Sequence, residues 1–423
     1  MRRLVSQNAL YILAATVCAG AMAWLGLTEF QWNDYGSEAA PSVHELLTGH
    51  IGGFFLHAPA YGGSLLIRAP FAFAANLWGG GELADYRMLA LPCLLAVCGL
   101  GLWLCDRMRA RGSSALARVA LIGVLLANPC VLYALEIGHP EELLAAVLCV
   151  AAMLAAISRR AVLAGVMIGL ALATKSWGLI ALPAVILTLP GGRLRALLSA
   201  IGTATAVLAP FLILQRLHST GGPGITDSSS GIIFWPQQLW WFLGDPHTIV
   251  RTAGGQVLVG FRAAPGWLSP VIHPLIVFLG VPLALLWSVR RRGRAGEPLA
   301  LLALLMLLRC ALDPWDSFYY ALPFLFALAS WEVTEHNRAP LLALAATALE
   351  WLCFRELASH VSPDAQAAAY VCWTLPGALA IACWLYLPDS ATRLARRAAG
   401  VLGASRHPDA LPEGAPTGVS ALS

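Results

Sequence analysis

The only lysine of the chain, Lys175, stands in the middle of a strongly apolar segment. Its surroundings, Ala173-Thr-Lys-Ser-Trp-Gly178, interrupt a run from 161 to 189 that holds no other charged residue. A lysine at membrane depth costs about 2.5–3.5 kcal/mol on insertion scales, so a functional role is the default hypothesis. We expect Lys175 to bind a phosphate group, with Trp177 as a substrate-binding candidate beside it. The alternative is a lysine that reaches for the membrane interface.

Two carboxylates, Asp34 and Glu38, follow the first apolar run of the sequence. A carboxylate just beyond a membrane span can face the membrane surface and remove the proton of an attacking hydroxyl group, which is general-base catalysis. In the alternative interpretation, Asp34 caps a turn and Glu38 faces water. The residues alone leave these two interpretations even.

A third polar group, Gly138-His-Pro-Glu-Glu142, opens an apolar segment. Proline at the first helical position and acids in the first turn are favourable at a helix N-terminus. This structural explanation leaves His139 and Glu136 free for polar contacts. We therefore weigh it evenly against a substrate-binding site that contains His139 and Glu141.

Four further candidates lie in segments that we expect on the outer side of the membrane. Arg68 and Arg262 are cations that could assist at a phosphate, although each by itself is more simply structural. Asp313 and Trp235 stand in aromatic-rich stretches, which could bind a sugar or form the aromatic belt of a membrane interface.

Other chemistries find no support in the sequence. The stretch from Gly169 to Ser176 has some features of a phosphate-binding loop, but Thr174 replaces its second glycine and no strand precedes it. The ten cysteines form no CxxC pair, and neither HExxH nor GxSxG occurs. We expect no certain cofactor, with a divalent metal as an open alternative.

The composition indicates where this chemistry would take place. Of 423 residues, 58% are hydrophobic and only 12% are charged, and the mean hydropathy is +0.71. Soluble domains carry roughly 25% charged residues, so an ordinary soluble enzyme is excluded and lipid is the solvent. The arginines are spread between apolar segments rather than gathered in a groove, which excludes nucleic acid as a partner.

The apolar segments predict an all-α, multi-pass protein of the cell membrane, and we expect the first to be retained rather than cleaved as a signal peptide. Segment 161–189 lies between two arginine pairs that the positive-inside rule places in the cytoplasm, so it must cross outward and return. About twelve transmembrane helices follow, with both termini cytoplasmic. The segments are 9–27, 86–105, 115–135, 141–157, 161–189, 195–214, 270–289, 298–312, 318–334, 339–357 and 367–387.

We divide the chain into a transmembrane domain, 1–389, and a disordered cytoplasmic tail, 390–423. A long first external loop, 28–85, contains an interrupted apolar stretch, 61–80, which we predict to be an interfacial helix. A second external loop spans 215–269. Most acidic residues fall on the outer side in this topology, so we expect the working face to be external.

Five short blocks, taken in their order along the chain, resemble those of a known family. They are Asn33–Glu38, Ala58–Gly63, Gly138–Glu142, Ala173–Trp177 and Asp313–Trp315. With the layout of spans and loops, they make roughly residues 5–390 similar to the GT-C superfamily of integral-membrane glycosyltransferases. Within it, the blocks look like those of actinobacterial polyprenol-phosphate-mannose-dependent mannosyltransferase-like proteins.

The resemblance implies an inverting transfer of a sugar, mannose or similar, from a polyprenyl-phosphate donor to a glycan, lipid or protein acceptor of the cell envelope, with membrane lipids as further partners. It implies Asp34 as the catalytic carboxylate. Glu38 is the alternative, because the block has one Asp rather than a pair, which also leaves a metal requirement open. Lys175 would stabilise the leaving phosphate.

Two other classes of protein fit the same sequence. A multi-pass transporter or a flippase for lipid-linked sugars would place Lys175 on its pathway, although transporters tend to show paired broken helices, and only one is found here. A noncatalytic assembly subunit would leave the burial of Lys175 unexplained.

Overall fold

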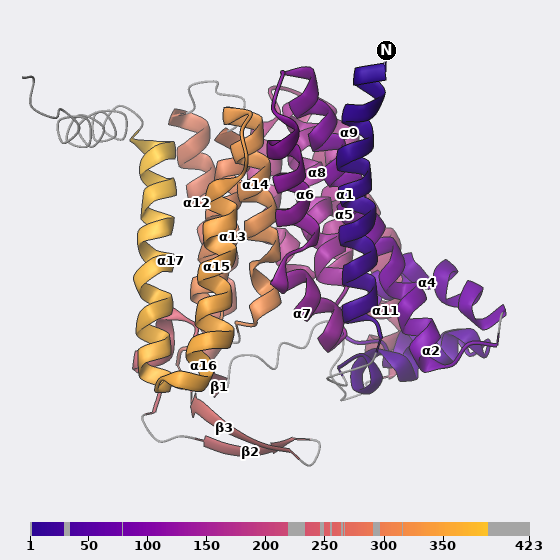
Figure 1. Ribbon diagram of the computed structural model, residues 1–423. Helices are drawn as coiled ribbons and strands as arrows, with labels where there is room; N and C mark the ends of the chain where they lie inside the picture. The colour runs from indigo at the N-terminus through magenta and orange to yellow at the C-terminus, as the bar shows by residue number, and fades with distance from the viewer. Residues whose placement is uncertain are drawn as a thin grey trace, which may run out of the picture.

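The structure of the chain is a computed structural model, which describes residues 2–28, 34–77, 79–218, 233–245, 249–253, 256–263, 265, 267–290, 297–314 and 316–387. The tail predicted over 390–423 lies outside the described residues. The described chain is mainly helical, as the sequence predicts. Its long helices run side by side as a bundle, and shorter elements cover the lower end (Figure 1).

In chain order, the first half of the molecule comprises α1 (Arg2–Gly26), η1 (Tyr35–Ala39), α2 (Ala40–Leu47), α3 (Ile51–His57), α4 (Gly62–Leu77), α5 (Glu82–Ala110), α6 (Ala115–Leu126), α7 (Pro129–Ile137), α8 (Glu141–Ile157), α9 (Ala161–Thr174), η2 (Ser176–Ile180), α10 (Leu182–Thr188) and α11 (Arg193–His218). The second half comprises β1 (Ile233–Phe234), η4 (Leu239–Leu243), β2 (Ile249–Ala253), β3 (Gln256–Ala263), α12 (Ser269–Arg290), α13 (Glu297–Leu312), η5 (Phe318–Ala321), α14 (Leu322–His336), α15 (Leu341–Trp351), η6 (Leu352–Glu356), α16 (Leu357–His360) and α17 (Pro363–Tyr386).

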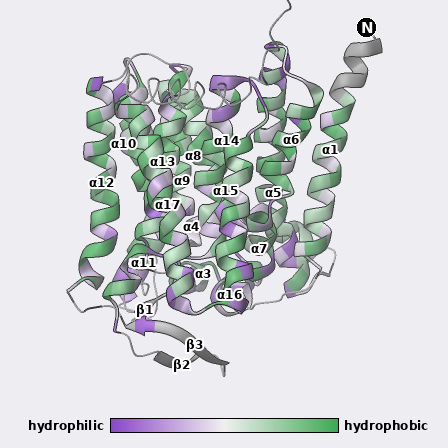
Figure 2. Cartoon of the chain, turned by 60° about the vertical axis from the view of Figure 1, so that its left-hand side comes forward, coloured by the Kyte–Doolittle hydropathy of each residue, from purple (hydrophilic) through white to green (hydrophobic). Residues whose placement is uncertain are grey.

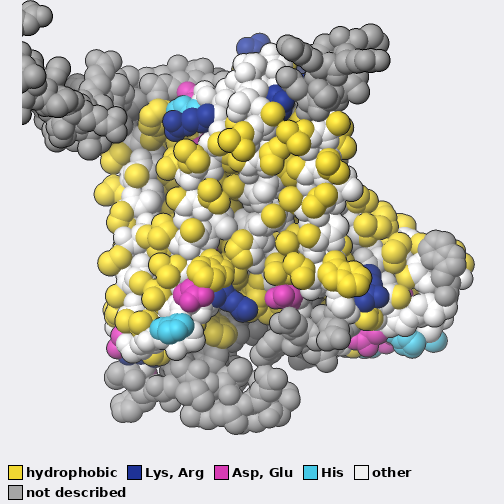
Figure 3. All heavy atoms as spheres, in the orientation of Figure 1, with side chains coloured by type: hydrophobic (Ala, Val, Ile, Leu, Met, Phe, Trp, Pro, Cys, Tyr) yellow, Lys and Arg dark blue, Asp and Glu magenta, His cyan; other side chains and the backbone are white. Residues whose placement is uncertain are grey.

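The distribution of side chains fits a protein whose solvent is lipid. Hydrophobic residues line most of the length of the helices, and hydrophilic residues gather at the two ends of the bundle (Figure 2). On the face drawn in Figure 3, a broad hydrophobic band separates charged side chains at its upper and lower edges. The apolar surface therefore lies where a bilayer would cover it.

Six helices among the described residues are long and apolar enough to cross a membrane by length and composition. The remaining apolar helices are shorter, so the count of about twelve spans remains a prediction. The six stretches are Ala9–Gly26, Glu82–Ala110, Ala115–Ile137, Arg193–His218, Pro270–Arg290 and Pro363–Tyr386.

The interior of the bundle is built from helices that are apolar on every side. Helix α8 packs against α5, α9, α13 and α14, and nearly every residue of α13 and α14 is buried. A helix that is hydrophobic all round has no face for water and takes such a position. By contrast, α11 leaves Leu198, Ile201 and Ile213 exposed, as a lipid-facing helix does.

The structure shows what becomes of the two apolar stretches that polar residues interrupt, 161–189 and 61–80. Helix α9 ends at Thr174, Lys175 has an extended backbone (φ −148°, ψ 131°), and η2 and α10 follow, so segment 161–189 breaks within the predicted turn. The stretch 61–80 forms α4, which lies near α2 at the lower end of the molecule (Figure 1). Its Arg68, which we expected as an outer-face cation, is buried instead.

The predicted loop 215–269 contains structure of its own. Helix α11 continues to His218, and the described residues beyond it include a small antiparallel sheet in the order β1-β3-β2. In its register, Phe234 lies opposite Arg262 and Ile249 opposite Phe261. The helical architecture therefore carries a short β addition that an all-α prediction does not include.

Candidate functional site

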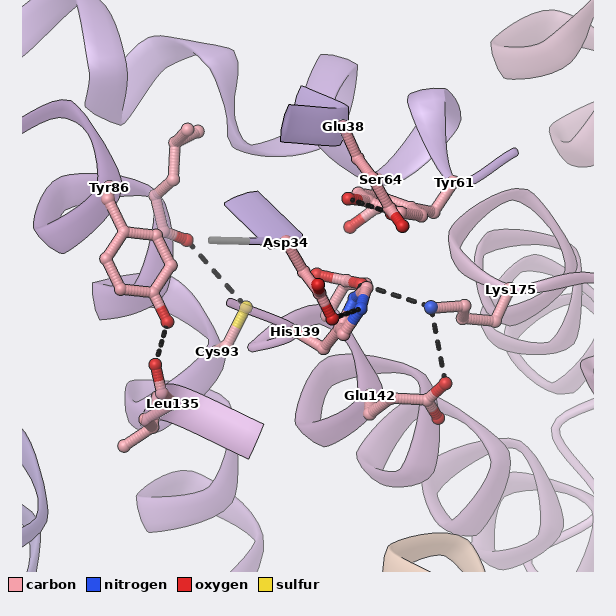
Figure 4. A network of polar contacts seen from close by, with 12 residues as sticks. Asp34, Glu38, Tyr61, Ser64, Tyr86, Cys93, Leu135, His139, Glu142 and Lys175 are labelled. Atoms are coloured by element: carbon pink, nitrogen blue, oxygen red, sulfur yellow. Dashed lines mark hydrogen bonds and ion pairs between the residues drawn. The ribbon is translucent and has the colours of Figure 1, made fainter. Parts of the chain in front are cut away.

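Ionisable side chains from separate parts of the chain meet in one buried polar network (Figure 4). Most of its members lie where one helix ends and the next begins, so the main chain can bend there and direct several side chains to the same place. They are Asp34 and Glu38 at η1, Tyr61 and Arg68 at α4, His139, Glu141 and Glu142 at the start of α8, and Lys175 and Trp177 at the break after α9.

Asp34 and His139 form the accessible end of the network. The Asp34 Oδ2 atom lies 3.3 Å from His139 Nε2, and the side chain of Asp34 is 25% exposed whereas that of His139 is 7% exposed. The Oδ1 atom of Asp34 has no hydrogen-bond partner among the described residues. Asp34 therefore offers one fixed oxygen and one free oxygen.

Glu141 connects this pair to two cations. Its Oε1 atom lies 2.8 Å from His139 Nδ1 and 3.1 Å from Lys175 Nζ, and its Oε2 atom lies 3.4 Å from an Nη2 atom of Arg68. Glu141 is completely buried. A carboxylate can be stable at that depth because three positively charged partners offset the loss of water.

Glu142 forms the other branch of the network. Its Oε1 atom lies 3.3 Å from Lys175 Nζ, and its Oε2 atom accepts a hydrogen bond of 3.1 Å from Trp177 Nε1. Lys175 therefore lies between two buried carboxylates that are neighbours in the sequence. Its charge is shared between them, and its predicted role at a phosphate group stays a prediction.

Glu38 reaches the same place through Tyr61. The Tyr61 hydroxyl donates a hydrogen bond of 2.9 Å to Glu38 Oε2, and Lys175 Nζ lies 4.6 Å from the centre of the Tyr61 ring. The ring also meets that of His139 edge-on at 5.5 Å. Both candidate bases, Asp34 and Glu38, thus belong to one neighbourhood.

A glycine before His139 permits the contact with Asp34. Gly138 ends α7 with φ of +105°, a conformation that side chains rarely adopt, and a Cβ atom there would lie 2.6 Å from the backbone nitrogen of Tyr35. Tyr35 follows Asp34 directly. The absence of a side chain at Gly138 therefore brings η1 against the start of α8.

A second glycine acts in the same way beside Lys175. A Cβ atom at Gly63, in the first turn of α4, would collide with the carbonyl oxygen of Ala173. This close approach places Tyr61 next to Lys175. The block Ala58–Gly63, singled out in the sequence, is explained by that packing.

His139 is protonated at neutral pH in these surroundings. Burial lowers the pKa of His139, but the Glu141 carboxylate and hydrogen bonds to Asp34 and Glu141 raise it by more, to about 9. Lys175 opposes the rise. An imidazolium cannot accept a proton, which leaves the carboxylates of Asp34 and Glu38 as the candidate bases.

Three predicted residues lie in contacts outside this network. Arg262 pairs with Asp364 at 2.8 Å and lies over the Trp241 ring at 4.5 Å. The backbone nitrogen of Trp235 donates to the Pro314 carbonyl oxygen at 3.3 Å, and Asp313 Oδ1 lies 3.9 Å from His273 Nε2. Asp313 also acts electrostatically on Arg309 and Tyr320. The predicted binding roles of Arg262, Trp235 and Asp313 stay predictions.

Several residues of the site were not among our candidates. The Tyr319 ring lies 5.1 Å from that of His139, and Arg309 lies over the rings of Trp177 and Tyr320 at 4.8 and 4.3 Å. The signal for Arg309 was available, since it is an arginine inside an apolar segment, the same signal that marked Lys175. Tyr319 and Tyr320 are indistinguishable in sequence from an interfacial belt.

Metal chemistry gains no support from the described part of the chain. Within it, no group of three or more His, Cys, Asp or Glu side chains is placed to hold a metal ion. The carboxylates of the network contact cations of the protein instead. A divalent metal therefore stays the open alternative that the sequence left.

A protein-family model matches residues 63–314, which is more than half of the chain. The chain belongs to glycosyltransferase family 87. It is thus a membrane glycosyltransferase, and the GT-C-like assignment made from the sequence fits this result. The match contains His139, Glu141, Lys175 and Arg309, whereas Asp34 and Glu38 precede it. No curated protein and no solved structure matches the chain.

Proposed function

We propose that this family 87 glycosyltransferase moves a sugar from a polyprenyl-phosphate donor to a hydroxyl group of a cell-envelope glycan, lipid or protein at the outer face of the membrane. Asp34 is the general base. The observation that carries the proposal is the connection from the partly exposed Asp34 through His139 and Glu141 to Lys175, in which no contact exceeds 3.3 Å. An attacking hydroxyl needs a base, and a leaving phosphate needs positive charge.

The geometry of Asp34 supports one order of events. His139 holds Oδ2, so Oδ1 is the atom that takes the proton of the acceptor hydroxyl. The acceptor oxygen forms its bond to the anomeric carbon while the bond from that carbon to the phosphate oxygen breaks. The bonding electrons leave with the phosphate, and the single displacement inverts the configuration of the sugar.

Glu38 is the alternative base. Its carboxylate is exposed and is oriented by the Tyr61 hydroxyl, so it could meet an acceptor from the side of the external loop. Asp34 is preferred because its carboxylate pairs directly with His139, which pairs with Glu141, whereas Glu38 reaches His139 only through the Tyr61 ring. The two candidates make different predictions for single substitutions.

The lipid-linked donor and the sugar, mannose or similar, rest on the sequence resemblance to polyprenol-phosphate-mannose-dependent proteins. A cation network within an apolar bundle supports a donor that is itself held in the membrane. Family membership favours a transferase over the transporter and flippase alternatives.

The test is sugar transfer by purified protein in lipid nanodiscs from a radiolabelled polyprenyl-phosphate mannose donor. Asp34→Asn keeps the shape of the side chain and should lower turnover by about 10²- to 10⁴-fold, the usual contribution of a general base. Glu38→Gln should have a smaller effect. Asp364→Asn, at the Arg262 contact, is the matched control and should stay close to wild type. Full activity of Asp34→Asn with loss in Glu38→Gln would transfer the role to Glu38, and full activity of both would reject the mechanism.

A further inference from the structure

Helix α13 contains one charged side chain at a depth where charge is costly. Arg309 is 4% exposed, and the residues on either side of it in the helix are apolar. A guanidinium carries five N–H donors and remains charged at any physiological pH. Its burial therefore requires compensation from groups around it.

The compensation comes from a hydrogen bond, from ring contacts and, at longer range, from the charges of Glu142 and Asp313. The Nη1 atom of Arg309 donates a hydrogen bond of 3.2 Å to the Tyr320 carbonyl oxygen, and the guanidinium lies over the rings of Tyr320 and Trp177. No carboxylate of the described residues lies within ion-pair distance of it, whereas Arg68 has Glu141. The remaining donors of Arg309 have no hydrogen-bond partner in the described part of the chain.

Arg309 is nonetheless part of the candidate site. Its ring contact Trp177 donates to Glu142, and Glu142 contacts Lys175. The network thus has two branches that start at Lys175. One runs through Glu141 and His139 to Asp34, and the other runs through Glu142 and Trp177 to Arg309.

The two cations of these branches, Lys175 and Arg309, differ in their partners. Lys175 contacts two carboxylates, so an incoming anion would have to compete with Glu141 and Glu142 for it. Arg309 forms no ion pair with a carboxylate of the described residues, although Glu142 and Asp313 are near enough to act on its charge. The contacts with the Trp177 and Tyr320 rings help to hold the guanidinium in place.

We propose that Arg309, held by Trp177 and Tyr320, is the anion-binding residue of this site and takes a phosphate ester. The planar guanidinium presents pairs of N–H groups whose spacing matches two oxygens of a phosphate, which a lysine ammonium cannot reproduce. The inference deepens the proposed function and rests on it for one point, namely that the phosphate is the leaving group of the donor. The phosphate could also belong to a phospholipid headgroup, which carries the same chemistry.

Binding to full-length protein in phosphatidylcholine nanodiscs tests the inference. The probes are farnesyl phosphate and farnesol, which differ only in the phosphate. Arg309→Gln should weaken binding of farnesyl phosphate by about tenfold or more, since a charge-assisted bidentate contact is lost, and should leave farnesol unchanged. Arg309→Lys should give an intermediate loss. The control is Arg107→Gln, which removes a guanidinium that lies over the Trp103 ring at 4.2 Å on α5.

A second arm identifies the source of the phosphate. Nanodiscs that contain phosphatidylglycerol are used to compete with farnesyl phosphate in wild type and in Arg309→Gln. A loss confined to farnesyl phosphate supports the donor as the ligand, and a loss confined to phosphatidylglycerol competition supports a phospholipid headgroup. If Arg309→Gln does not fold, as judged by thermal unfolding, Arg309→Lys carries the comparison.

The outcomes separate this inference from the proposed function. Equal losses for farnesyl phosphate and farnesol, or no loss in either arm, would overturn the role of Arg309. If Arg309→Gln changes neither phosphate binding nor sugar transfer, the role of Arg309 is rejected and the proposed function stands. If Arg309→Gln selectively loses phosphate binding but the wild-type protein transfers no sugar from any polyprenyl-phosphate donor, the anion site stands and the proposed donor is rejected.

Discussion

Lys175 pairs with two buried carboxylates, so its substitution would affect stability as well as activity. Its ammonium group offsets the charge of Glu141 and Glu142, both of which are buried. Removing one partner of a buried ion pair leaves an uncompensated charge, which commonly costs about 3–5 kcal/mol. A loss of activity after such a change would therefore mix a structural effect with a chemical one.

A double substitution separates the two effects. We expect Lys175→Met to lower the free energy of unfolding by roughly 3–5 kcal/mol. Glu141 keeps His139 and Arg68 as partners, whereas Glu142 loses the cation with which it forms an ion pair. Adding Glu142→Gln removes that uncompensated charge and should recover part of the loss, without restoring sugar transfer. Thermal unfolding and transfer assays on the two variants check this. A fully stable Lys175→Met protein would show that the buried carboxylates do not depend on the lysine.

His139 should make stability depend on pH. Its pKa, ordinarily about 6.5, is raised to about 9 in the folded protein. Between these values the folded state binds a proton that the unfolded state does not, so the stabilisation is complete below about pH 6.5 and is lost as the pH rises through about 9. The melting temperature of wild type should therefore fall between pH 7 and 10, and that of His139→Gln should fall less. Parallel curves would contradict the raised pKa.

At the scale of elements, the contact between η1 and the start of α8 depends on Gly138. Alanine at this position would have to adopt φ of +105°, and its Cβ would meet the Tyr35 backbone. The strained conformation costs about 1 kcal/mol or more. The collision adds a displacement of η1, and with it of Asp34.

We expect Gly138→Ala to lose most of the sugar transfer, because Asp34 moves away from His139. Gly112→Ala is the matched control, since Gly112 also has a positive φ (+77°) but nothing lies within 4 Å of its missing Cβ. The control should lose a similar amount of stability from backbone strain and keep its activity. Equal activity in the two variants would mean that the approach of Tyr35 does not position Asp34.

The sequence predicts the elements of this site better than their contacts. The helix break at Lys175 and the helix start at Glu141 follow from local signals, a charge in an apolar run and acids after a proline. The pairing of Asp34 with His139 does not, because it depends on a close approach of segments that lie about a hundred residues apart in the sequence. Arg262 carried the same local signal as Arg68, and only the folded chain shows that one pairs with Asp364 and the other with Glu141.

At the scale of the whole molecule, the site needs parts of the chain on both sides of the family match. Asp34 and Glu38 precede residue 63, and Tyr319 and Tyr320, which contact His139 and Arg309, follow residue 314. Helix α14 packs against α8 and α13, so the C-terminal helices belong to the same bundle. We therefore expect the matched segment alone to be an incomplete enzyme.

The same C-terminal helices contain a buried carboxylate outside the network of Asp34 and Lys175. Glu350, on α15, is 1% exposed, and neither of its carboxylate oxygens has a hydrogen-bond partner among the described residues. Asp316, whose Oδ2 accepts a hydrogen bond of 2.6 Å from Tyr370, likewise has one oxygen without a partner in that part of the chain. Burying an unpaired polar group costs about 1–3 kcal/mol.

Replacing Glu350 by a side chain of similar volume should therefore stabilise the bundle. We expect Glu350→Met to raise the free energy of unfolding by about 1–3 kcal/mol. The change removes no hydrogen bond of the described residues and replaces an unpaired buried carboxyl group with an apolar one. Glu332→Met is the matched control. This glutamate is also buried, but it accepts hydrogen bonds of 3.0 and 2.8 Å from the backbone N–H groups of Leu342 and Ala343, so its replacement should destabilise the protein. Denaturation of the purified proteins in one detergent measures both. If Glu350→Met unfolds as readily as the control, then Glu350 is held by a water or an ion, and its carboxylate contributes to the stability of α15.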